Sequence, residues 1–600
     1  MTEEPARGFP LHRRTVLSGL AASAIAPAAA RAQPLALPPD PRLLVTAADW
    51  RQLEIRRAAD PDLALLVTRL LERARKDLAL PPLERKLEGR RLLGVSREFI
   101  RRVLLWSFAR RLTGDQVYLE RARREMLQVA GFADWNPAHF LDVAEMTTGM
   151  AIGYDWLRRE IPTDERALVR RAIVDKGIAQ VRNGHPTFRM KNNWGQVCIG
   201  GMVLGALAVG DEEPELAAAV LAAGKAEAFT ALAAYKPDGV YPEGPSYWVY
   251  GTSYETLLVA ALRSALATDW GLMGAPGLAR SAAFYAHAIG PTGRSFNFAD
   301  GGEGQELATP LFYLARALNV PTLIAAKRAM IRQNQGLGER FAPLAALWWP
   351  GEAEAGEPAR HFFGQGPQPV AIWRSAWNDP KALYFAIKGG GANHNHGHMD
   401  AGSFVLDLDG IRWAVDLGMQ DYNSLESRGI DLWSMKQTSP RWQVFRLGSA
   451  AHNTLTIGGS LHNAAGMASL DARGEDGAVI DLTPVFLPGQ VQRASRAVRI
   501  DGRAVRLRDE ISGARPGAAI RWALTTRAAI TLEDRTAVLR QDGQVLRVRF
   551  EGAPVVLGAP DISAPRSEFD APNPGARQLL ATAPADAAGS WSLAVTLEGG

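Results

Sequence analysis

Apolar side chains recur at spacings of three and four residues through the first half of the chain. The spacing is clearest in residues 98–112, 140–158 and 164–181, and it extends from about residue 41 to about residue 349. Such spacing lines one face of an α-helix with apolar residues. We therefore expect many consecutive, paired helices. No fixed repeat length is visible, which argues against a regular solenoid.

The pattern changes after a Gly- and Pro-rich stretch at residues 351–369. Beyond it, short runs alternate apolar with polar residues or carry β-branched residues, and Gly or Asp turns separate them. This pattern is typical of antiparallel strands. The runs lie at residues 383–388, 403–408, 412–416, 454–457, 498–500, 505–510, 545–550 and 590–597.

The two patterns together predict an α+β multidomain fold, with a helical toroid packed against an antiparallel β-sandwich. We assign residues 33–350 to the toroid, residues 351–369 to a linker and residues 370–600 to the sandwich. The Ala- and Pro-rich stretch near residues 552–588 leaves a small C-terminal lobe as an open alternative. We expect any cleft for a polymer at the junction of the toroid and the sandwich.

Composition narrows the class of protein. The 600 residues are 47% hydrophobic and 22% charged, which is typical of soluble globular chains and excludes disorder, collagen and a coiled coil. Lys and Arg total 68 against 63 for Asp and Glu, and the excess is spread thinly. This charge permits an anionic substrate and gives no reason to expect nucleic acid as a partner. Cys198 is the only cysteine, so no disulfide within the chain stabilises the fold.

The first 32 residues have the features of a twin-arginine export signal. Arg13 and Arg14 precede an apolar run at residues 16–30, and Ala-Arg-Ala at residues 30–32 suits a cleavage site. The alternative is a membrane anchor, but the run is short and Ala-rich, whereas a spanning helix needs about 20 strongly apolar residues. We expect a periplasmic or secreted protein with no stable membrane anchor after cleavage.

Histidines gather in one short segment. Three of the 10 lie within residues 393–400, Asn-His-Asn-His-Gly-His-Met-Asp, directly before a predicted strand. Zinc takes His nitrogen and carboxylate oxygen as ligands, and Asp400, Asp416 and His452 are further candidates. The alternative is a set of hydrogen-bonded loop histidines without a metal. The residue types alone favour neither interpretation.

Two motifs in the helical region are more polar than their surroundings. Asn192 and Asn193 precede an apolar helix predicted at residues 197–209, where an N-cap would explain them equally well. The second motif, residues 235–250, combines two carboxylates, turn residues and five aromatic side chains before another predicted helix. It could line a sugar cleft or form a hydrophobic corner whose Tyr hydroxyls bond to the backbone, and the residues alone favour the corner.

At these residues the chain resembles the heparinase II/III-like polysaccharide lyases, the superfamily that also includes oligoalginate lyases. The resemblance begins at Pro-Arg-Leu-Leu-Val-Thr, residues 41–46, and returns at Asn-Asn-Trp and Glu-Gly-Pro-x-Tyr. It is strongest in residues 388–454, where His-Gly-His-Met-Asp-Ala-Gly-Ser-Phe, Trp-Ala-Val-Asp-Leu-Gly and His-Asn-Thr follow in that order. Residues beyond about 514 contribute little.

The resemblance implies an incomplete (α/α) toroid joined to a β-sandwich, with a lyase site between them. It implies β-elimination at a uronic acid of an anionic polysaccharide or oligosaccharide, in which the C5 proton is removed and the sugar on the C4 oxygen is expelled. In the family's pattern the residue at Asn193 contacts the uronate carboxylate together with a histidine of the β domain, which His396 matches. Tyr247 matches the family's general acid. Either Tyr247 or His396 could be the base; an unperturbed His is the easier base near neutral pH.

The resemblance also implies a zinc site and the walls of the cleft. The motif positions of the zinc ligands are His398, Asp416 and His452, and because elimination needs no hydroxide we expect this zinc to be structural. Candidates for substrate binding are Asn192, Trp194, Glu243 and Tyr250. Asn192 and Asn193 stand where oligoalginate lyases usually carry Asn-His, a form more similar to heparinase III. No cluster of Arg and Lys that would recognise sulfate can be placed in the cleft from the sequence.

Two other classes of function remain. A glycoside hydrolase on a toroid fold would need two carboxylates about 5 to 9.5 Å apart across the bond, and Asp238, Glu243 and Asp300 are available for it. A carbohydrate-binding relative without catalysis would use aromatic rings as stacking surfaces, namely those of Tyr241, Tyr247, Trp248 and Tyr250. The presence of Asn193, Tyr247 and His396 argues against this last class.

Overall fold

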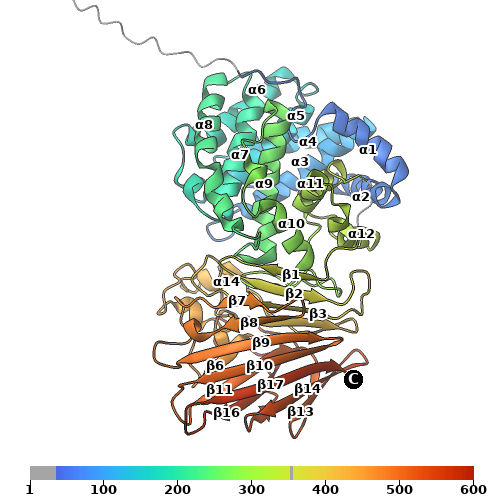
Figure 1. Ribbon diagram of the computed structural model, residues 1–600. Coiled ribbons are helices and arrows are strands. Elements are labelled where there is room, and N and C mark those ends of the chain that lie inside the picture. The colour runs from blue at the N-terminus through green and yellow to red at the C-terminus, as the bar shows by residue number, and fades with distance from the viewer. Residues whose placement is uncertain (1–34, 352–355) are drawn as a thin grey trace, which may run out of the picture.

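The structure, a computed structural model, describes residues 35–351 and 356–600. The predicted export signal, residues 1–32, lies outside the described residues. Figure 1 shows the helical part of the chain on one side and three antiparallel sheets stacked below it. The predicted order of a helical region followed by a β region is confirmed.

The helical part is an incomplete (α/α) toroid. Its helices are α1 (Ala47–Ala59), α2 (Pro61–Asp77), α3 (Leu93–Thr113), α4 (Gln116–Ala130), α5 (Phe140–Leu157), α6 (Thr163–Ala172), α7 (Asn193–Val209), α8 (Pro214–Leu232), α9 (Gly244–Leu266), α10 (Leu278–His287), α11 (Thr309–Leu318), α12 (Ala325–Arg332) and α13 (Ala342–Leu347). Helices α5 and α7 pack against each other and are buried along nearly their whole length. The sequence of α7 is apolar on all faces, whereas α5 also buries Asp142, Glu145 and Asp155.

Close packing of α5 and α7 depends on small residues. A Cβ added to Gly201 would lie 2.4 Å from the carbonyl oxygen of Ala144, so only glycine allows this approach. The helix predicted at residues 164–181 is shorter than expected. Helix α6 ends at Ala172, and a π-helical turn, Ile173–Gly177, and a 3-10 turn, Ile178–Val181, follow it. Gly177 has non-helical angles, φ −109° and ψ −97°, which interrupts the regular helix.

One described helix segment, residues 214–235, is long and apolar enough to cross a membrane by length and composition. It comprises α8 and the turn after it, and α8 packs against α7 within the toroid. Core helices of soluble proteins have the same composition. Its packing is that of a toroid helix.

The β part contains three antiparallel sheets. They have the strand orders β1-β2-β3-β4-β5, β12-β13-β14-β17-β10-β9-β8-β7 and β15-β16-β11-β6. The strands are β1 (His361–Gly364), β2 (Val370–Arg374), β3 (Tyr384–Lys388), β4 (Phe404–Leu408), β5 (Ile411–Ala414), β6 (Leu455–Ile457), β7 (Ser469–Ala472), β8 (Gly477–Asp481), β9 (Arg493–Asp501), β10 (Ala504–Ser512), β11 (Ala519–Thr526), β12 (Ala529–Glu533), β13 (Thr536–Gln541), β14 (Gln544–Gly552), β15 (Val556–Gly558), β16 (Arg577–Pro584) and β17 (Trp591–Gly599). Each of the eight predicted strands overlaps one of these.

Two segments differ from the prediction. Strand β1 lies within residues 351–369, which the sequence assigned to a linker, and it pairs with β2. The Ala- and Pro-rich stretch near residues 552–588 forms no separate lobe, because β16 pairs with β11 inside the third sheet. Glycine and proline content therefore misassigned the linker, and the pairing of β16 settles the open question of a C-terminal lobe.

The first sheet is the middle layer of the molecule. In β2, Val370 and Ile372 belong to the apolar core of the toroid, whereas Ala371 and Trp373 belong to the core between the sheets. Successive side chains of a strand point to opposite faces, so a strand covered on both faces is apolar throughout. This explains why β2 lacks the alternation that marks a half-exposed strand.

The segment between α10 and α11, residues 288–308, lies on this first sheet. Arg374 donates to the carbonyl oxygens of His287 and Ile289 at 3.0 and 2.9 Å, and Arg412 donates to those of Ser295 and Arg294 at 2.9 and 3.0 Å. These buried contacts fix the segment at the junction of toroid and sheets. It carries Asp300 into the site described next.

Candidate active site

A cavity of about 520 Å³ lies between the toroid and the β part. The toroid contributes Asn193, Trp194 and Tyr247 to its wall, and the β part contributes His396 and Tyr422. The expected position of the cleft, at the junction, is therefore where the predicted catalytic residues come together. Asn192 and Tyr250, two of the predicted substrate-binding residues, also line it.

Asn192 and Asn193 have different roles at the start of α7. Asn192 is the N-cap, and its Oδ1 accepts a hydrogen bond from the backbone N–H of Trp194 at 3.1 Å. Asn193 is buried and its Nδ2 donates to Glu243 Oε2 at 2.8 Å. The capping interpretation therefore holds for Asn192. Asn193 does not cap the helix, and it lines the cavity.

Glu243 does not line the cavity. It lies behind the wall and joins its two sides: Asn193 donates to one carboxylate oxygen and Asn395, from the histidine-rich loop, donates to the other at 2.6 Å. Burial raises the pKa of Glu243, although His396 and the two amides favour its charged form. Its contacts make it a residue that orients two amides, which differs from the predicted contact with substrate.

Tyr247 lies in the first turn of α9 and faces the β part. Its ring is stacked on that of His396, with 3.9 Å between the ring centroids and 17° between the planes. Its hydroxyl is 2.6 Å from the hydroxyl of Tyr422. Burial and the charge of Asp300 raise the pKa of Tyr247 above its ordinary value. The phenol is therefore protonated in the free protein, as a general acid must be.

His396 is held in place by a buried carboxylate. Its backbone has φ 62°, an uncommon left-handed conformation for a non-glycine residue. His396 Nδ1 is 2.7 Å from Asp300 Oδ2, and Tyr422 donates to the same oxygen at 2.9 Å. Because Asp300 accepts, Nδ1 carries the hydrogen and Nε2 is the basic nitrogen.

Asp300 also binds groups on its other oxygen. Its Oδ1 is 2.8 Å from His398 Nε2 and accepts from Arg441 Nη2 at 2.9 Å. Burial would raise the pKa of this carboxyl, but Arg441 and the two histidines hold it well below its usual range. Asp300 is therefore an ionised hub that connects His396 to His398.

His398, Asp416 and His452 form a buried group whose ligand atoms lie within 4.8 Å of one another. His398 Nδ1 and His452 Nε2 are buried, and neither has a hydrogen-bond partner among the described residues. Their other ring nitrogens bond to Asp300 and Asp416 at 2.8 and 2.9 Å. Free nitrogens backed by carboxylates are the arrangement of metal-binding histidines, so this group fits a metal ion.

The aromatic motif of residues 235–250 divides into buried and cavity-lining parts. Tyr241 and Trp248 are completely buried and offer no surface for a sugar. Tyr250 lines the cavity, but its hydroxyl donates to the buried Glu145 at 2.7 Å. The predicted stacking surface is therefore reduced to Tyr247 and Tyr250.

Residues 371–589 match the model of the family described as Heparinase II/III-like, C-terminal. This part of the chain is similar to the C-terminal domains of that family. No curated protein matches the chain by sequence.

Several solved structures share the fold of the whole chain. Heparinase III is 14% identical with a TM-score of 0.57, and the match covers 87% of this chain and 79% of the other. Heparan sulfate lyase from Pedobacter heparinus is 12% identical with a TM-score of 0.55, covering 93% and 92%. Chondroitin AC lyase from Streptomyces coelicolor is 15% identical with a TM-score of 0.52, covering 92% and 83%. The likeness extends over toroid and sheets alike.

The structure places three residues in this site that the sequence did not assign to it. Tyr422, the first residue of the short helix α14 (Tyr422–Glu426), and Arg441 lie in the long segment between β5 and β6 and contact the hub Asp300. Asp300 itself, from the toroid side, was considered only as a hydrolase carboxylate. None of them lies in a compact motif. Their proximity to His396 arises from the tertiary fold, and a fully buried Arg441 is the only unusual feature among them.

Proposed function

We propose that the protein is a polysaccharide lyase that cleaves a uronic-acid-containing polysaccharide or oligosaccharide by β-elimination. The observation that carries this proposal is the stack of Tyr247 on His396 in the wall of the cavity, beside Asn193. The solved structures of like fold, named as lyases for heparan sulfate and chondroitin, support the same class of reaction. The product would be an unsaturated uronate.

In this proposal His396 is the base and Tyr247 the acid. His396 Nε2 removes the C5 proton, the bond from C4 to the leaving oxygen breaks, and C4 and C5 become doubly bonded. Tyr247 gives its hydroxyl proton to the leaving oxygen. The raised pKa of Tyr247 supports the role of acid and opposes that of base. Asp300 keeps His396 in the tautomer that leaves Nε2 free.

The charge that develops on the uronate carboxylate needs hydrogen-bond donors. Asn193 and Asn395 each use one amide hydrogen on Glu243, and each retains a second one. In this proposal these remaining N–H groups face the carboxylate. Donors fixed in advance stabilise a developing negative charge without reorganising during the reaction.

We further propose that His398, Asp416 and His452 hold a structural zinc ion. When bound, zinc would cross-link the histidine-rich loop to the segments after β5 and before β6. The reaction consumes no water, so it needs no metal-activated hydroxide. The free nitrogens of both histidines support this assignment.

The three carboxylates that the sequence offered to a hydrolase are committed to other contacts. Asp300 accepts hydrogen bonds from four groups, and its pKa is lowered. It is therefore ionised and has no proton to give as a general acid. Glu243 lies behind two asparagines. Asp238 pairs with Arg280 and with a backbone N–H near β1. None of these three carboxylates is therefore free to act in the pair that hydrolysis requires.

We also propose export through the twin-arginine route, on the basis of Arg13, Arg14 and the apolar run after them. Fractionation of cells that express the chain, with and without an Arg13→Lys and Arg14→Lys double substitution, tests this proposal. Accumulation of the substituted protein inside the cells supports it. Equal export of both forms refutes it.

The proposed reaction is tested by ultraviolet absorbance of the unsaturated product. The purified protein is incubated with glucuronan, alginate, heparan sulfate and hyaluronan, beside Tyr247→Phe and His396→Ala. Tyr118→Phe and His361→Ala are matched controls, since neither residue lines the cavity. A rise in absorbance that only the site substitutions abolish supports the lyase. Release of reducing ends without absorbance would favour a hydrolase instead.

A further inference from the structure

A second cavity, of about 490 Å³, adjoins the first. Both cavities are lined by Gly94, Arg97, Tyr247 and Tyr250, so these residues form a shared wall. The proposed acid, Tyr247, borders both spaces. A polymer that lies across Tyr247 with its reacting uronate in the first cavity would place a neighbouring sugar in the second.

Two arginines from distant parts of the sequence meet at this wall. Arg97 lies on α3 and Arg340 lies just before α13, and both are tied to the buried carboxylate of Glu145. Arg97 Nε donates to Glu145 Oε1 at 3.0 Å, and Arg340 Nε is 3.5 Å from Glu145 Oε2. Their guanidinium carbons lie over the ring of Tyr250, 4.8 and 5.2 Å from its centroid. The arrangement fixes both side chains before any ligand arrives.

The cluster has a net positive charge. Burial alone would raise the pKa of Glu145, but Arg340 and Arg97 lower it, so this carboxyl is ionised near neutral pH. Two guanidinium groups against one carboxylate leave one positive charge.

Four other carboxylates line the second cavity. Glu98 is paired with Arg101 and Arg102, and Asp300 is paired with Arg441. Burial raises the pKa of Glu306 and of Glu339, that of Glu339 to about 8. They therefore offset this charge less than their number suggests.

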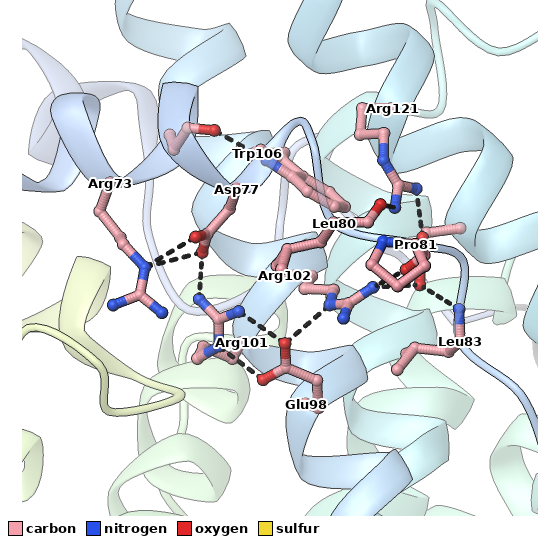
Figure 2. Close-up of polar contacts among 12 residues, drawn as sticks. Arg73, Asp77, Leu80, Pro81, Leu83, Glu98, Arg101, Arg102, Trp106 and Arg121 are labelled. Atoms are coloured by element: carbon pink, nitrogen blue, oxygen red, sulfur yellow. Dashed lines mark hydrogen bonds and ion pairs between the residues drawn. The ribbon is translucent and has the colours of Figure 1, made fainter.

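The arginines that line the second cavity differ in how many of their N–H groups already make hydrogen bonds within the protein. Arg101 is committed to Glu98 and Asp77 in a network of ion pairs between α2 and α3 (Figure 2). Arg340 is less committed: its charged partner is Glu145, 3.5 Å from its Nε, and that buried nitrogen makes no hydrogen bond among the described residues. Its side chain is 21% exposed and lines the cavity. A guanidinium that lines a cavity and has unused donors fits an anionic ligand.

We propose that Arg97 and Arg340 bind an anionic group, a carboxylate or a sulfate, on the sugar next to the reacting uronate. The planar fork of a guanidinium matches both of these groups. The protein would then prefer polymers that carry a charge on every sugar over those with neutral sugars between uronates. This inference rests on the proposed function, because it assigns the neighbouring subsite of the same cleft.

The test compares Arg340→Gln and Arg340→Lys with the wild type on two kinds of polymer. Glucuronan carries a carboxylate on every sugar and N-sulfated heparan sulfate carries a sulfate beside each uronate, whereas hyaluronan has neutral sugars between its uronates. Arg499→Gln is the matched control, because Arg499 is exposed on β9 and lines neither cavity. KM and kcat are measured from the absorbance of the product.

We expect Arg340→Gln to raise KM on glucuronan or heparan sulfate at least about tenfold more than on hyaluronan, since a hydrogen bond to a charged group is lost. We expect kcat to change by less than about threefold, because Arg340 does not touch the reacting atoms. Arg340→Lys should recover part of the effect, since it keeps the charge without the fork. The polymer that responds distinguishes carboxylate from sulfate.

Other outcomes overturn the inference. A KM that rises equally on all polymers, or on none, shows that Arg340 does not recognise a neighbouring charge. Cleavage of hyaluronan alone by the wild type has the same consequence. Absence of product on every polymer overturns the proposed function and this inference with it, whereas product formation that is insensitive to Arg340 overturns the inference only.

Discussion

The ring of Tyr247 is stacked on the ring of His396 at a centroid distance of 3.9 Å, although one belongs to a toroid helix and the other to the β part. Two groups that the proposed reaction uses as acid and base are thus held on the same side of the cavity. Their relative position depends on the packing of the two parts of the chain.

Tyr247→Phe keeps the stack and removes only the hydroxyl. We expect kcat to fall by about 10²–10⁴-fold with little change in KM, as for loss of a general acid. Steady-state rates on the best polymer of the panel measure both constants. Tyr422→Phe is the matched comparison, because it removes the hydroxyl that bonds to Tyr247 and should lower kcat less. A Tyr247→Phe protein with more than a tenth of wild-type kcat would contradict the role of acid.

Asp300→Asn changes the hub between His396 and His398. Asparagine has one acceptor oxygen and places an amide donor where the carboxylate accepts, so His396 loses its fixed tautomer. We expect kcat to fall at least about 10- to 100-fold, as for other residues that orient a functional histidine. We also expect a lower thermal unfolding temperature, because Arg441 keeps a buried charge without its partner.

The pH–rate profile of Asp300→Asn distinguishes a loss of His396 orientation from a loss of folded protein. If Asp300 sets the tautomer of His396, Asp300→Asn should move the acidic limb of the kcat/KM profile as well as its height. Asp238→Asn, at a partly exposed carboxylate away from the cavity, serves as the control. A lowered profile of unchanged shape would mean that Asp300 acts on the fold alone.

The candidate catalytic residues lie in short motifs that the sequence made visible, whereas the residues that contact them do not. Asn193, Tyr247 and His396 lie in compact polar motifs, and the structure brings all three to one cavity. Asp300, Tyr422 and Arg441 lie in segments without a repeated or unusual pattern. Which of many aspartates meets a given histidine is decided by long-range packing, which local sequence does not encode.

The fold shows the same division. Strands with one exposed face, such as β9 and β10, alternate and were predicted from that alternation. Strand β2 is covered on both faces and its five residues are all buried, so period-two alternation is absent. Arg97 and Arg340 are far apart in the sequence, so only the fold shows that they meet at the cleft.

A metal content measurement tests the His-Asp-His group. We expect about one zinc ion per chain, and His452→Ala should lose it together with several degrees of thermal stability, since an ion bound only by the folded state stabilises that state. His361→Ala, on strand β1, should retain the metal. Full zinc content in His452→Ala would show that the ion binds elsewhere. A metal-free wild type of unchanged stability after zinc addition would refute the site.

Glu255, a buried acid outside the cavity, contributes to the pH dependence of stability. Burial raises the pKa of Glu255, on α9, from about 4.5 to about 8, and one of its oxygens has no hydrogen-bond partner among the described residues. Between these two values the folded chain keeps a proton that the unfolded chain releases. The free energy of unfolding therefore falls as pH rises through this window, by at most about 1.4 kcal/mol per pH unit from this group.

Glu255→Gln removes this dependence while keeping the size of the side chain. We expect the substituted protein to gain stability over the wild type as the pH is raised from 5 to about 8. Thermal or urea unfolding at both pH values measures the gain. Glu54→Gln, at an exposed carboxylate, should show no such trend. An advantage of Glu255→Gln that is equal at both pH values would mean that Glu255 is ionised in the folded protein across the window.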